Sequence, residues 1–226
     1  MKKAVVLTGA GISAESGIKT FRDSGGLWEE YDIMDVATPE AWERDPELVN
    51  EFYNQRRRQL YEVGPNDAHY ALVELEQKYD VRIITQNIDD LHERAGSSNV
   101  MHLHGELKKV RSSVDESLIY ELEGWRLKMG DRCEKGSQLR PHVVWFGEAV
   151  PMIPAAADLS NEADIYIIIG TSLNVYPAAG LVSYVRPGTP VFLIDPGEMN
   201  VSYIPGVKHI REKAGRGSRI LVDELL

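Results

Sequence analysis

The strongest fold signal lies in residues 4–14, which read Ala4-Val5-Val6-Leu7-Thr8-Gly9-Ala10-Gly11-Ile12-Ser13-Ala14. Four apolar residues followed by threonine and glycine are typical of a buried strand that ends in a tight turn. Gly9, Gly11 and Ala14 have the spacing of the G-x-G-x-x-A fingerprint, whose glycines let the backbone approach a pyrophosphate. An ordinary glycine turn explains the same residues, because the acidic residue expected about 20 positions later, after a second strand, is not in place.

Three further apolar runs, at 81–85, 165–169 and 191–194, have the composition of strands that are covered on both faces. Helical patterns lie beside them, at 46–61, 67–78 and 178–185. This alternation of strands and helices predicts an α/β fold with a Rossmann-like, doubly wound parallel sheet.

Two segments fit the sheet pattern poorly. Residues 22–70 carry helical periodicity without strands, and residues 108–140 are charged and irregular. We therefore expect these two insertions to form a small lobe. The Rossmann-like domain is then expected to comprise residues 1–21, 71–107 and 141–226.

The composition is that of an ordinary globular protein. Of the 226 residues, 43% are hydrophobic and 27% are charged, which argues against disorder. The formal net charge of −10 argues against a dedicated nucleic-acid-binding protein, whose binding surface is usually basic. The apolar run near the start is too short for a signal peptide, and no stretch is long enough for a membrane helix.

Cys133 is the only cysteine. A single cysteine excludes an internal disulfide and a cysteine-based zinc cluster, and it suits a reducing compartment. We therefore expect a soluble cytoplasmic protein that has neither a membrane nor a nucleic acid as its partner.

Polar residues follow the predicted strands at their carboxyl ends, where ligands of doubly wound sheets bind. After the second strand the chain reads Thr85-Gln86-Asn87-Ile88-Asp89, and after the third it reads Gly170-Thr171-Ser172. Amides and carboxylates can hydrogen-bond ribose hydroxyls or a carboxamide, and backbone and hydroxyl donors can bind phosphate. Alternatively, Asn87 or Asp89 caps the next helix and the second segment is an ordinary loop.

Two histidines lie in Met101-His102-Leu103-His104-Gly105, and the alternation of a strand places them on one face. One interpretation is a metal pair, although the spacing supplies no third ligand. The other is a general base with a structural neighbour. His104 is the better candidate for the base, because the glycine that follows it leaves room for a substrate.

Two segments are candidates for substrate binding. Tyr53 and Arg56 share a helix face, which is either a solvated face or a phenol and a guanidinium that bind a carboxylate together. The extended apolar stretch 139–148 either pairs with an extended peptide or forms a core strand.

Together and in this order, the motifs resemble the sirtuins, NAD-dependent protein lysine deacylases, over nearly the whole chain. The resemblance implies NAD as the cofactor and His104, Asn87 and Asp89 as catalytic residues. The residues it implies for NAD binding are Gly9, Ala10, Gly11, Ser13, Phe21, Arg22, Gln86, Asn87, Asp89, Gly170, Thr171, Ser172, Asp195 and Ala214. The residues it implies for binding an acylated lysine peptide are Tyr53, Arg56, Val144, Trp145, Phe146 and Gly147.

The implied reaction needs no metal. The acyl-lysine carbonyl oxygen attacks the ribose carbon that carries nicotinamide, nicotinamide leaves, and an alkylamidate forms. His104 then acts as a general base on a ribose hydroxyl, which attacks the amidate carbon. The products are free lysine, nicotinamide and O-acyl-ADP-ribose.

Tyr53 and Arg56 resemble the signature of sirtuins that accept acidic acyl groups. We therefore expect removal of succinyl and malonyl groups, with Arg56 pairing with the distal carboxylate, and also of acetyl groups. Ala37 and Ala41 make the acyl pocket roomy if they face it.

The chain departs from the family pattern in its small lobe. Most sirtuins carry four zinc cysteines there, whereas this chain has Cys133 alone, so we expect no zinc. A packed helix is expected to stabilise residues 108–140 instead. Its evidence is a capping box at Ser113 and Glu116 and helical spacing of the apolar residues Leu118, Ile119, Leu122 and Trp125.

A second departure is Asp195, where the family usually has asparagine beside the adenine-side ribose. A carboxylate accepts from ribose hydroxyls but disfavours a 2′-phosphate, so we expect NAD to be preferred over NADP.

Two other functions fit parts of the pattern. Tyr53 and Arg56 argue against an ADP-ribosyltransferase or NAD hydrolase, and His104 argues against a non-catalytic module that binds NAD or ADP-ribose.

Overall fold

The computed structural model describes residues 1–19 and 31–226. A six-stranded sheet forms its larger part, and every pairing in that sheet is parallel. The strands, in spatial order, are β3 (Val100–His102), β2 (Tyr79–Thr85), β1 (Lys2–Thr8), β7 (Ile165–Ile169), β8 (Val191–Ile194) and β9 (Lys208–Ile210). The four apolar runs of the sequence lie in β1, β2, β7 and β8, which confirms the predicted α/β fold.

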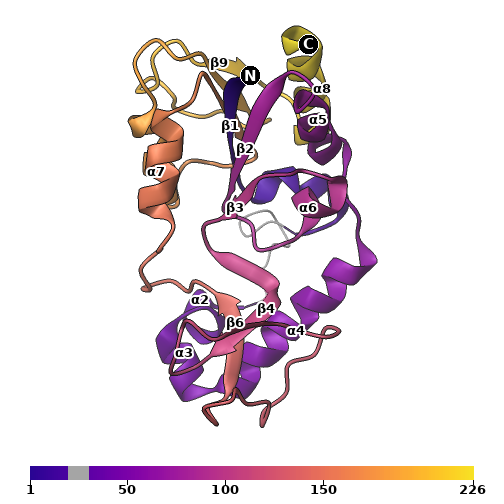
Figure 1. The fold of residues 1–226 in the computed structure, drawn as a ribbon, viewed down its shortest axis with the longest axis vertical. Coiled ribbons are helices and arrows are strands. Elements are labelled where there is room, and N and C mark those ends of the chain that lie inside the picture. The colour runs from indigo at the N-terminus through magenta and orange to yellow at the C-terminus, as the bar shows by residue number, and fades with distance from the viewer. Residues whose placement is uncertain (20–30) are drawn as a thin grey trace.

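Helices cover both faces of this sheet (Figure 1). Helices α5 (Asp67–Leu75) and α8 (Ala214–Leu225) pack on one face, where alternate strand residues such as Val6 and Ile167 point. Helix α7 (Ile153–Asn161) and the 3-10 helix η3 (Ala178–Tyr184) pack on the other face, against Val5 and Ile168. Because both sides are covered, β7 is buried along its whole length, which explains its continuous apolar sequence.

The strand order also places the site. The chain leaves the central strand β1 toward β2 and β3, and it later returns to the opposite side of β1 through β7, β8 and β9. The connections that follow β1 and β7 therefore diverge at their carboxyl ends. In doubly wound sheets this divergence is where ligands bind.

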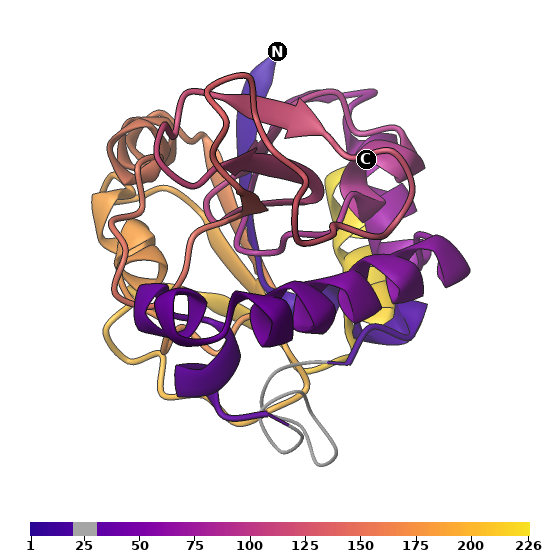
Figure 2. The same cartoon turned by 90° about the horizontal axis from the view of Figure 1, so that it is seen from below.

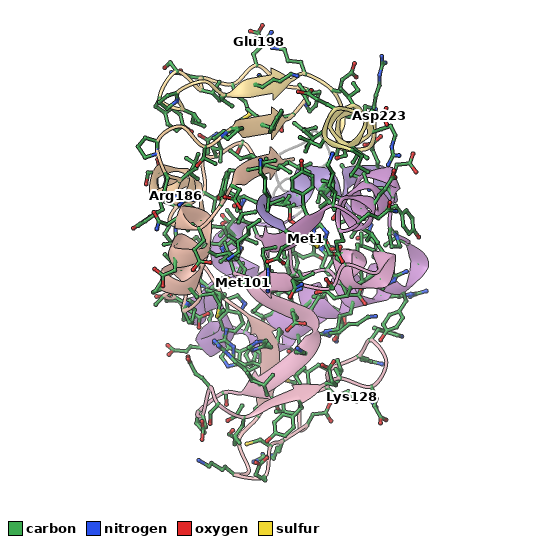
Figure 3. All side chains as sticks on the ribbon, turned by 45° about the horizontal axis from the view of Figure 1, so that its top comes forward. Met1, Met101, Lys128, Arg186, Glu198 and Asp223 are labelled. Carbon is green, nitrogen blue, oxygen red and sulfur yellow. The ribbon has the colours of Figure 1, made fainter. Side chains whose placement is uncertain are left out.

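A second layer lies below the large sheet in Figure 1. It contains the helices α2 (Ile33–Val36), α3 (Pro39–Arg44) and α4 (Pro46–Glu62). It also contains an antiparallel sheet of β5 (Ile119–Glu121), β4 (Gly105–Ser112) and β6 (Leu139–Val143), in that spatial order. Helix α4 packs against β4 and β6, and in Figure 2 it runs in purple across the molecule. Figure 3 shows Lys128, in this layer, at the opposite end from Glu198.

The structure confirms helices at the three predicted patterns, but their ends or their type differ from the prediction. The pattern at 46–61 is α4, which begins after Asp45, whose carboxylate accepts from the N–H of Leu48. The pattern at 67–78 ends as a helix at Leu75, and the pattern at 178–185 is a 3-10 helix. The small sheet spans residues 105–143 and so overlaps the predicted lobe, while the division into domain and lobe stays a prediction. No helix among the described residues is both long and apolar enough to cross a bilayer.

The predicted helix at 113–125 is wrong. Residues 119–121 are strand β5, in which Ile119 pairs with Arg111 and Glu121 pairs with Lys109 of β4. Ser112, rather than Ser113, makes the local turn, because its Oγ accepts from two backbone N–H groups that follow it. Gly124 has a φ of +73°, which a right-handed helix does not allow. Pairing with a distant strand thus outweighed the local helical spacing.

Arg57 holds α4 to the small sheet. It is fully buried, and its Nε donates to the carbonyl of Leu107 at 2.6 Å. Its Nη1 donates to Asn54 Oδ1 at 2.6 Å and to the carbonyl of Trp125 at 3.0 Å. Asn54 in turn donates to the carbonyl of Leu127 and accepts from its N–H, at 3.0 and 2.8 Å. Two polar side chains of one helix therefore fix the segment from 125 to 127.

We expect Arg57→Ala to lower the free energy of unfolding by about 3 kcal/mol, because it leaves buried carbonyls without their donors. The matched control is Arg58→Ala, one residue further on, where the side chain is largely exposed and the change should stay within about 0.5 kcal/mol. Urea denaturation followed by circular dichroism measures both values. Equal destabilisation by the two variants would contradict the assignment.

Candidate active site

The loops that follow β1 and β7 lie against each other. Gly9 N donates to the carbonyl of Ile169 at 3.0 Å, and Gly11 N donates to the carbonyl of Gly170 at 2.8 Å. A Cβ on Gly11 would lie 2.7 Å from Gly170 Cα, and a Cβ on Gly9 would lie 2.8 Å from Gly170 O. The glycines of the fingerprint are therefore required by a contact between two loops of the protein, in addition to any approach of a ligand.

Asn87 joins the loop after β2 to the loop after β1. Its Nδ2 donates to the carbonyl of Gly9 at 3.2 Å and to Ser13 Oγ at 3.1 Å. Ser13 Oγ donates to Asp89 Oδ2 at 2.9 Å. All three side chains are buried, so residues that the sequence pattern placed at two separate strand ends form one hydrogen-bonded cluster.

Gln86 reaches the third loop. Its Nε2 donates to Thr171 Oγ1 at 3.1 Å, and its N–H donates to the carbonyl of Thr8 at 2.9 Å. The carboxyl ends of β1, β2 and β7 therefore meet, as the sequence predicts. Ser172 follows Thr171 on the exposed side of the same loop.

Asp89 makes the local helix-start contact and also joins the hydrogen-bonded cluster around Ser13. Its Oδ1 accepts from the N–H of Leu91 at 3.2 Å and so caps the first turn of α6 (Leu91–Ala95), while its Oδ2 accepts from Ser13. Burial raises the pKa of Asp89, and the hydrogen bonds from Leu91 and Ser13 oppose that rise. Asn87 directs its amide at Gly9 and Ser13 instead of capping α6.

His104 has the geometry of a base whose tautomer is defined. Its Nδ1 lies 2.8 Å from the carbonyl of Gln86, and a carbonyl only accepts, so Nδ1 carries the proton and Nε2 keeps a lone pair. Burial lowers the pKa of His104, partly opposed by the bond to Gln86, so the ring is neutral at pH 7. The predicted reason for Gly105 is incomplete. Its φ is +80°, and a Cβ there would lie 2.1 Å from the carbonyl of His142.

His102 ends strand β3, and its ring, like that of His104, is directed at a carbonyl of the loop after β2. Its Nδ1 is 3.0 Å from the carbonyl of Asn87, and its Nε2 is 2.8 Å from Glu93 Oε1. Figure 3 places Met101 where the chain passes from the large sheet toward the small one. Within residues 1–19 and 31–226, no three histidine, cysteine or carboxylate side chains gather as a metal-binding group.

The sequence analysis missed a buried hydrogen-bond chain behind Asn87. The hydroxyl of Thr8 donates to Thr85 Oγ1 at 2.8 Å, and Thr85 Oγ1 accepts from the N–H of Asn87 at 3.0 Å. His92 Nε2 lies 3.2 Å from Thr8 Oγ1. A threonine at the end of each of two paired apolar strands, in register with each other, is the signal that could have found it.

The stretch at 139–148 is a strand only in part. Its first half is strand β6, and its second half leaves the sheet, with Val144 N donating to the carbonyl of His104 at 2.9 Å. Phe146 N donates to the carbonyl of Ala37 at 3.0 Å. Trp145 is buried and Phe146 is half exposed. Strand β6 lies at the edge of its sheet, and its last residue, Val143, pairs with Gly105, the residue after His104.

Glu148 and Arg140 hold this turn, and neither was singled out from the sequence. Glu148 Oε2 accepts from the N–H of Trp145 at 2.7 Å, and its Oε1 accepts from Arg140 Nη1 at 2.8 Å. Burial alone raises the pKa of Glu148, but the bonds from Arg140 and Trp145 outweigh it and lower the pKa. The Arg140 guanidinium stacks on Trp145, with Cζ 3.2 Å from the ring centroid.

Tyr53 and Arg56 both lie on α4. Tyr53 is buried, and burial raises the pKa of its hydroxyl, so it remains a hydrogen-bond donor at neutral pH. It packs in one apolar cluster with Ala37, Ala41 and Trp145. The predicted pocket alanines are thus grouped with Tyr53.

The run from Arg56 to Arg58 is not one solvated face. Arg57 is fully buried, Arg56 is half buried, and only Arg58 has the largely exposed side chain of a solvated face. The Arg56 guanidinium lies over two rings, with Cζ 4.6 Å from the centroid of Phe52 and 5.9 Å from that of Tyr31. Cation–π contacts of this kind restrict where a guanidinium points.

The remaining predicted cofactor residues lie farther along the same end of the sheet. Asp195 directly follows β8, and its Oδ1 accepts from the N–H of Gly197 at 2.8 Å. Ala214 begins α8, which contacts the short 3-10 helix η1 (Ala10–Ile12). Phe21 and Arg22 lie outside the described residues.

Comparison with known proteins agrees with this geometry. Residues 9–177 match the model of the Sir2 family. The chain belongs to the Sir2 family. It is 55% identical over 226 residues to an NAD-dependent protein deacylase of Helicobacter pylori (strain ATCC 700392 / 26695), covering 100% of this chain and 98% of that protein. It is 57% identical over 222 residues to one of Bacteroides thetaiotaomicron, covering 96% and 95%.

The fold of this Sir2 family member is also that of solved relatives. A mutant Sir2 homologue in complex with ADP-ribose superposes with a TM-score of 0.92 at 43% identity, over 99% of this chain and 92% of that chain. The likeness extends over both sheets, so the small antiparallel sheet is part of the common fold.

Hydrogen bonds close the end of the lobe in this Sir2 family member. Ser112 Oγ lies 2.8 Å from Ser137 Oγ, which lies 3.1 Å from Cys133 Sγ. Lys135 Nζ and Asp115 Oδ2 form an ion pair at 2.6 Å. These side chains connect the turn before β5 to the segment before β6. The absence of zinc stays a prediction.

We expect the purified protein to hold no stoichiometric zinc and to keep its activity after dialysis against a chelator, because hydrogen bonds already close the lobe. Elemental analysis and an assay before and after chelation measure this. Cys133→Ser should leave both results unchanged. One zinc per chain, or unfolding on chelation, would show that the prediction is wrong.

Proposed function

We propose that this Sir2 family member is an NAD-dependent protein-lysine deacylase that removes succinyl and malonyl groups, and also acetyl groups. Its family and the names of its relatives support NAD-dependent deacylation. The proposal that acidic acyl groups are removed rests on one observation, which is that the Arg56 guanidinium lies beside the apolar cluster of Tyr53. A cytoplasmic location and a cationic, lysine-bearing peptide partner stay predictions from composition and charge.

The residues present fit NAD. Three loops at the switch point of the sheet bring backbone N–H groups, hydroxyls and amides together, and this donor set suits a pyrophosphate, ribose hydroxyls and a carboxamide. Asn87 and Asp89 would orient the nicotinamide and its ribose, and Asp195 would accept from the adenine-side ribose. NAD, when bound, supplies the ribose carbon that releases nicotinamide and takes up the acyl oxygen.

His104 is the proposed general base. Its Nδ1–H is held by the carbonyl of Gln86, so Nε2 is the atom that takes a proton from a ribose hydroxyl. The bond from Val144 N to the carbonyl of His104 supports a peptide-binding role for residues 144–147, because they adjoin the proposed base. A peptide that pairs with Val144–Gly147 would therefore present its acyl-lysine next to His104.

Arg56 and Tyr53 are the proposed acyl-specificity residues. Stacking uses the faces of a guanidinium, whereas hydrogen bonds to a carboxylate lie in its plane, so contact with Phe52 is compatible with a bidentate bond to a distal carboxylate. The Tyr53 hydroxyl would add a neutral donor. Ala37 and Ala41 in the same cluster leave space that larger side chains would fill.

We expect His104→Ala to bind NAD normally and to lose between about 10² and 10⁴ in turnover, the usual contribution of a general base. In the unaltered chain, kcat/KM should fall as the pH drops through the lowered pKa of His104, because a protonated Nε2 cannot accept a proton. Calorimetry with NAD and a pH series on an acyl peptide measure the two effects. Full turnover by His104→Ala would show that His104 is not the general base.

For the acyl group, mass spectrometry of matched succinyl-lysine and acetyl-lysine peptides, with and without NAD, is the decisive measurement. We expect faster removal of succinyl, and we expect Arg56→Met to reverse the preference by lowering kcat/KM for succinyl about 10- to 100-fold. Arg58→Met, on the exposed side of the same helix, is the control and should keep the preference. Removal of acetyl groups alone would show that Arg56 has a structural role instead. Consumption of NAD without deacylation would favour a transferase or a hydrolase.

A further inference from the structure

Asn87 is held through its backbone as well as through its amide. Its N–H donates to Thr85 Oγ1 at 3.0 Å, and its carbonyl lies 3.0 Å from Nδ1 of His102. The His102 side chain is 8% exposed, and its other nitrogen lies 2.8 Å from Glu93 Oε1. The proposed chemistry has no role for His102 or Glu93.

These two contacts define the protonation of His102. A backbone carbonyl and an ionised carboxylate are both acceptors, and neither can donate to the ring. A neutral imidazole carries one N–H, so it can satisfy only one of them and must turn a lone pair toward the other. Only the imidazolium donates to Asn87 and Glu93 together.

The surrounding charges favour that state. Burial alone would lower the pKa of His102, but the bond and charge of Glu93 and the carbonyl of Asn87 outweigh it and raise the pKa. Burial likewise raises the pKa of Glu93, but the bond and charge of His102 outweigh it and lower the pKa. The other groups that face the pair are Asp89 before α6, His92 on α6, Glu106 and Lys109 on β4, and His69 on α5.

We propose that Glu93 and His102 form a positioning pair in which cationic His102 holds the Asn87 carbonyl and thereby keeps the Asn87 amide on Gly9 and Ser13. The inference rests on the proposed role of Asn87 in orienting nicotinamide and ribose. Loss of the His102 proton leaves one N–H, which stays on Glu93 because a hydrogen bond to an ionised carboxylate is stronger than one to a neutral carbonyl. The peptide group of Asn87 is then no longer held from its carbonyl side. The pair thus makes productive NAD binding depend on pH, on the alkaline side.

The test uses the full chain and the variants Glu93→Gln, His102→Gln and Glu74→Gln. Glutamine at 93 removes the charge that keeps His102 protonated, and glutamine at 102 supplies one neutral donor that does not titrate in this range. Glu74→Gln removes the same charge from an ion pair with Arg219, away from the site, and is the matched control. Imidazole nitrogen NMR gives the pKa of His102, and a pH series gives kcat/KM for NAD and the Kd of NAD.

In the unaltered chain, kcat/KM for NAD should fall at alkaline pH with the same midpoint as the NMR titration of His102. Glu93→Gln should move both midpoints to lower pH together, and Glu74→Gln should move neither. His102→Gln should lose this alkaline limb and lower kcat/KM for NAD about tenfold, the size of one lost hydrogen bond, with little change in KM for the peptide.

The positioning role is overturned if the NMR midpoint moves in Glu93→Gln while the alkaline limb of the kinetics stays in place. It is also overturned if His102→Gln keeps the limb. Failure of the proposed function is a separate result. A chain that binds NAD without deacylating a peptide still tests the positioning pair, because the pair makes the Kd of NAD depend on pH. A pH-independent Kd in that case, with His102 titrating, overturns the inference as well.

Discussion

The N–H of Gly11 donates to the carbonyl of Gly170, and at neither residue does the backbone leave space for a Cβ. This contact joins the loop after β1 to the loop after β7 across the point where the strand order reverses. Gln86 and Asn87 can then reach Thr171 and Gly9, respectively, from the third loop. The three strand ends are already adjacent because β1 pairs with β2 and with β7, and the close packing of the first two loops brings Thr171 and Gly9 within reach of the third loop. The rest of the site depends on that geometry.

His102 and His104 lie two residues apart and have opposite protonation. Both direct Nδ1 at a carbonyl of the same loop, His102 at Asn87 and His104 at Gln86. The difference lies at Nε2, where Glu93 faces His102. Two groups of the same type thus have pKa values shifted in opposite directions by their surroundings.

The small lobe is held by polar side chains that act over long sequence distances. Arg57 on α4 donates to carbonyls at 107 and 125, and the hydroxyls of Ser112 and Ser137 meet at 2.8 Å. The lobe in turn carries the turn at Trp145, which Glu148 fixes beside His104. Stability of the lobe and placement of the turn at Trp145 therefore depend on the same layer of the molecule.

The sequence alone determined the parallel sheet, the glycine loops and α4, because these arise from local apolar periodicity and from the spacing of glycines and polar residues. It also indicated which strand ends carry the site. Only the tertiary structure decided that residues 119–121 are a strand, that Arg57 is buried and that His102 is cationic. Each of these depends on partners far along the chain or across a turn, namely β4, the carbonyls of 107 and 125, and Glu93 with Asn87. In each case the local conformational preference is weaker than a hydrogen bond or charge interaction made in the protein interior. The groups that make these interactions come together only once the chain has folded.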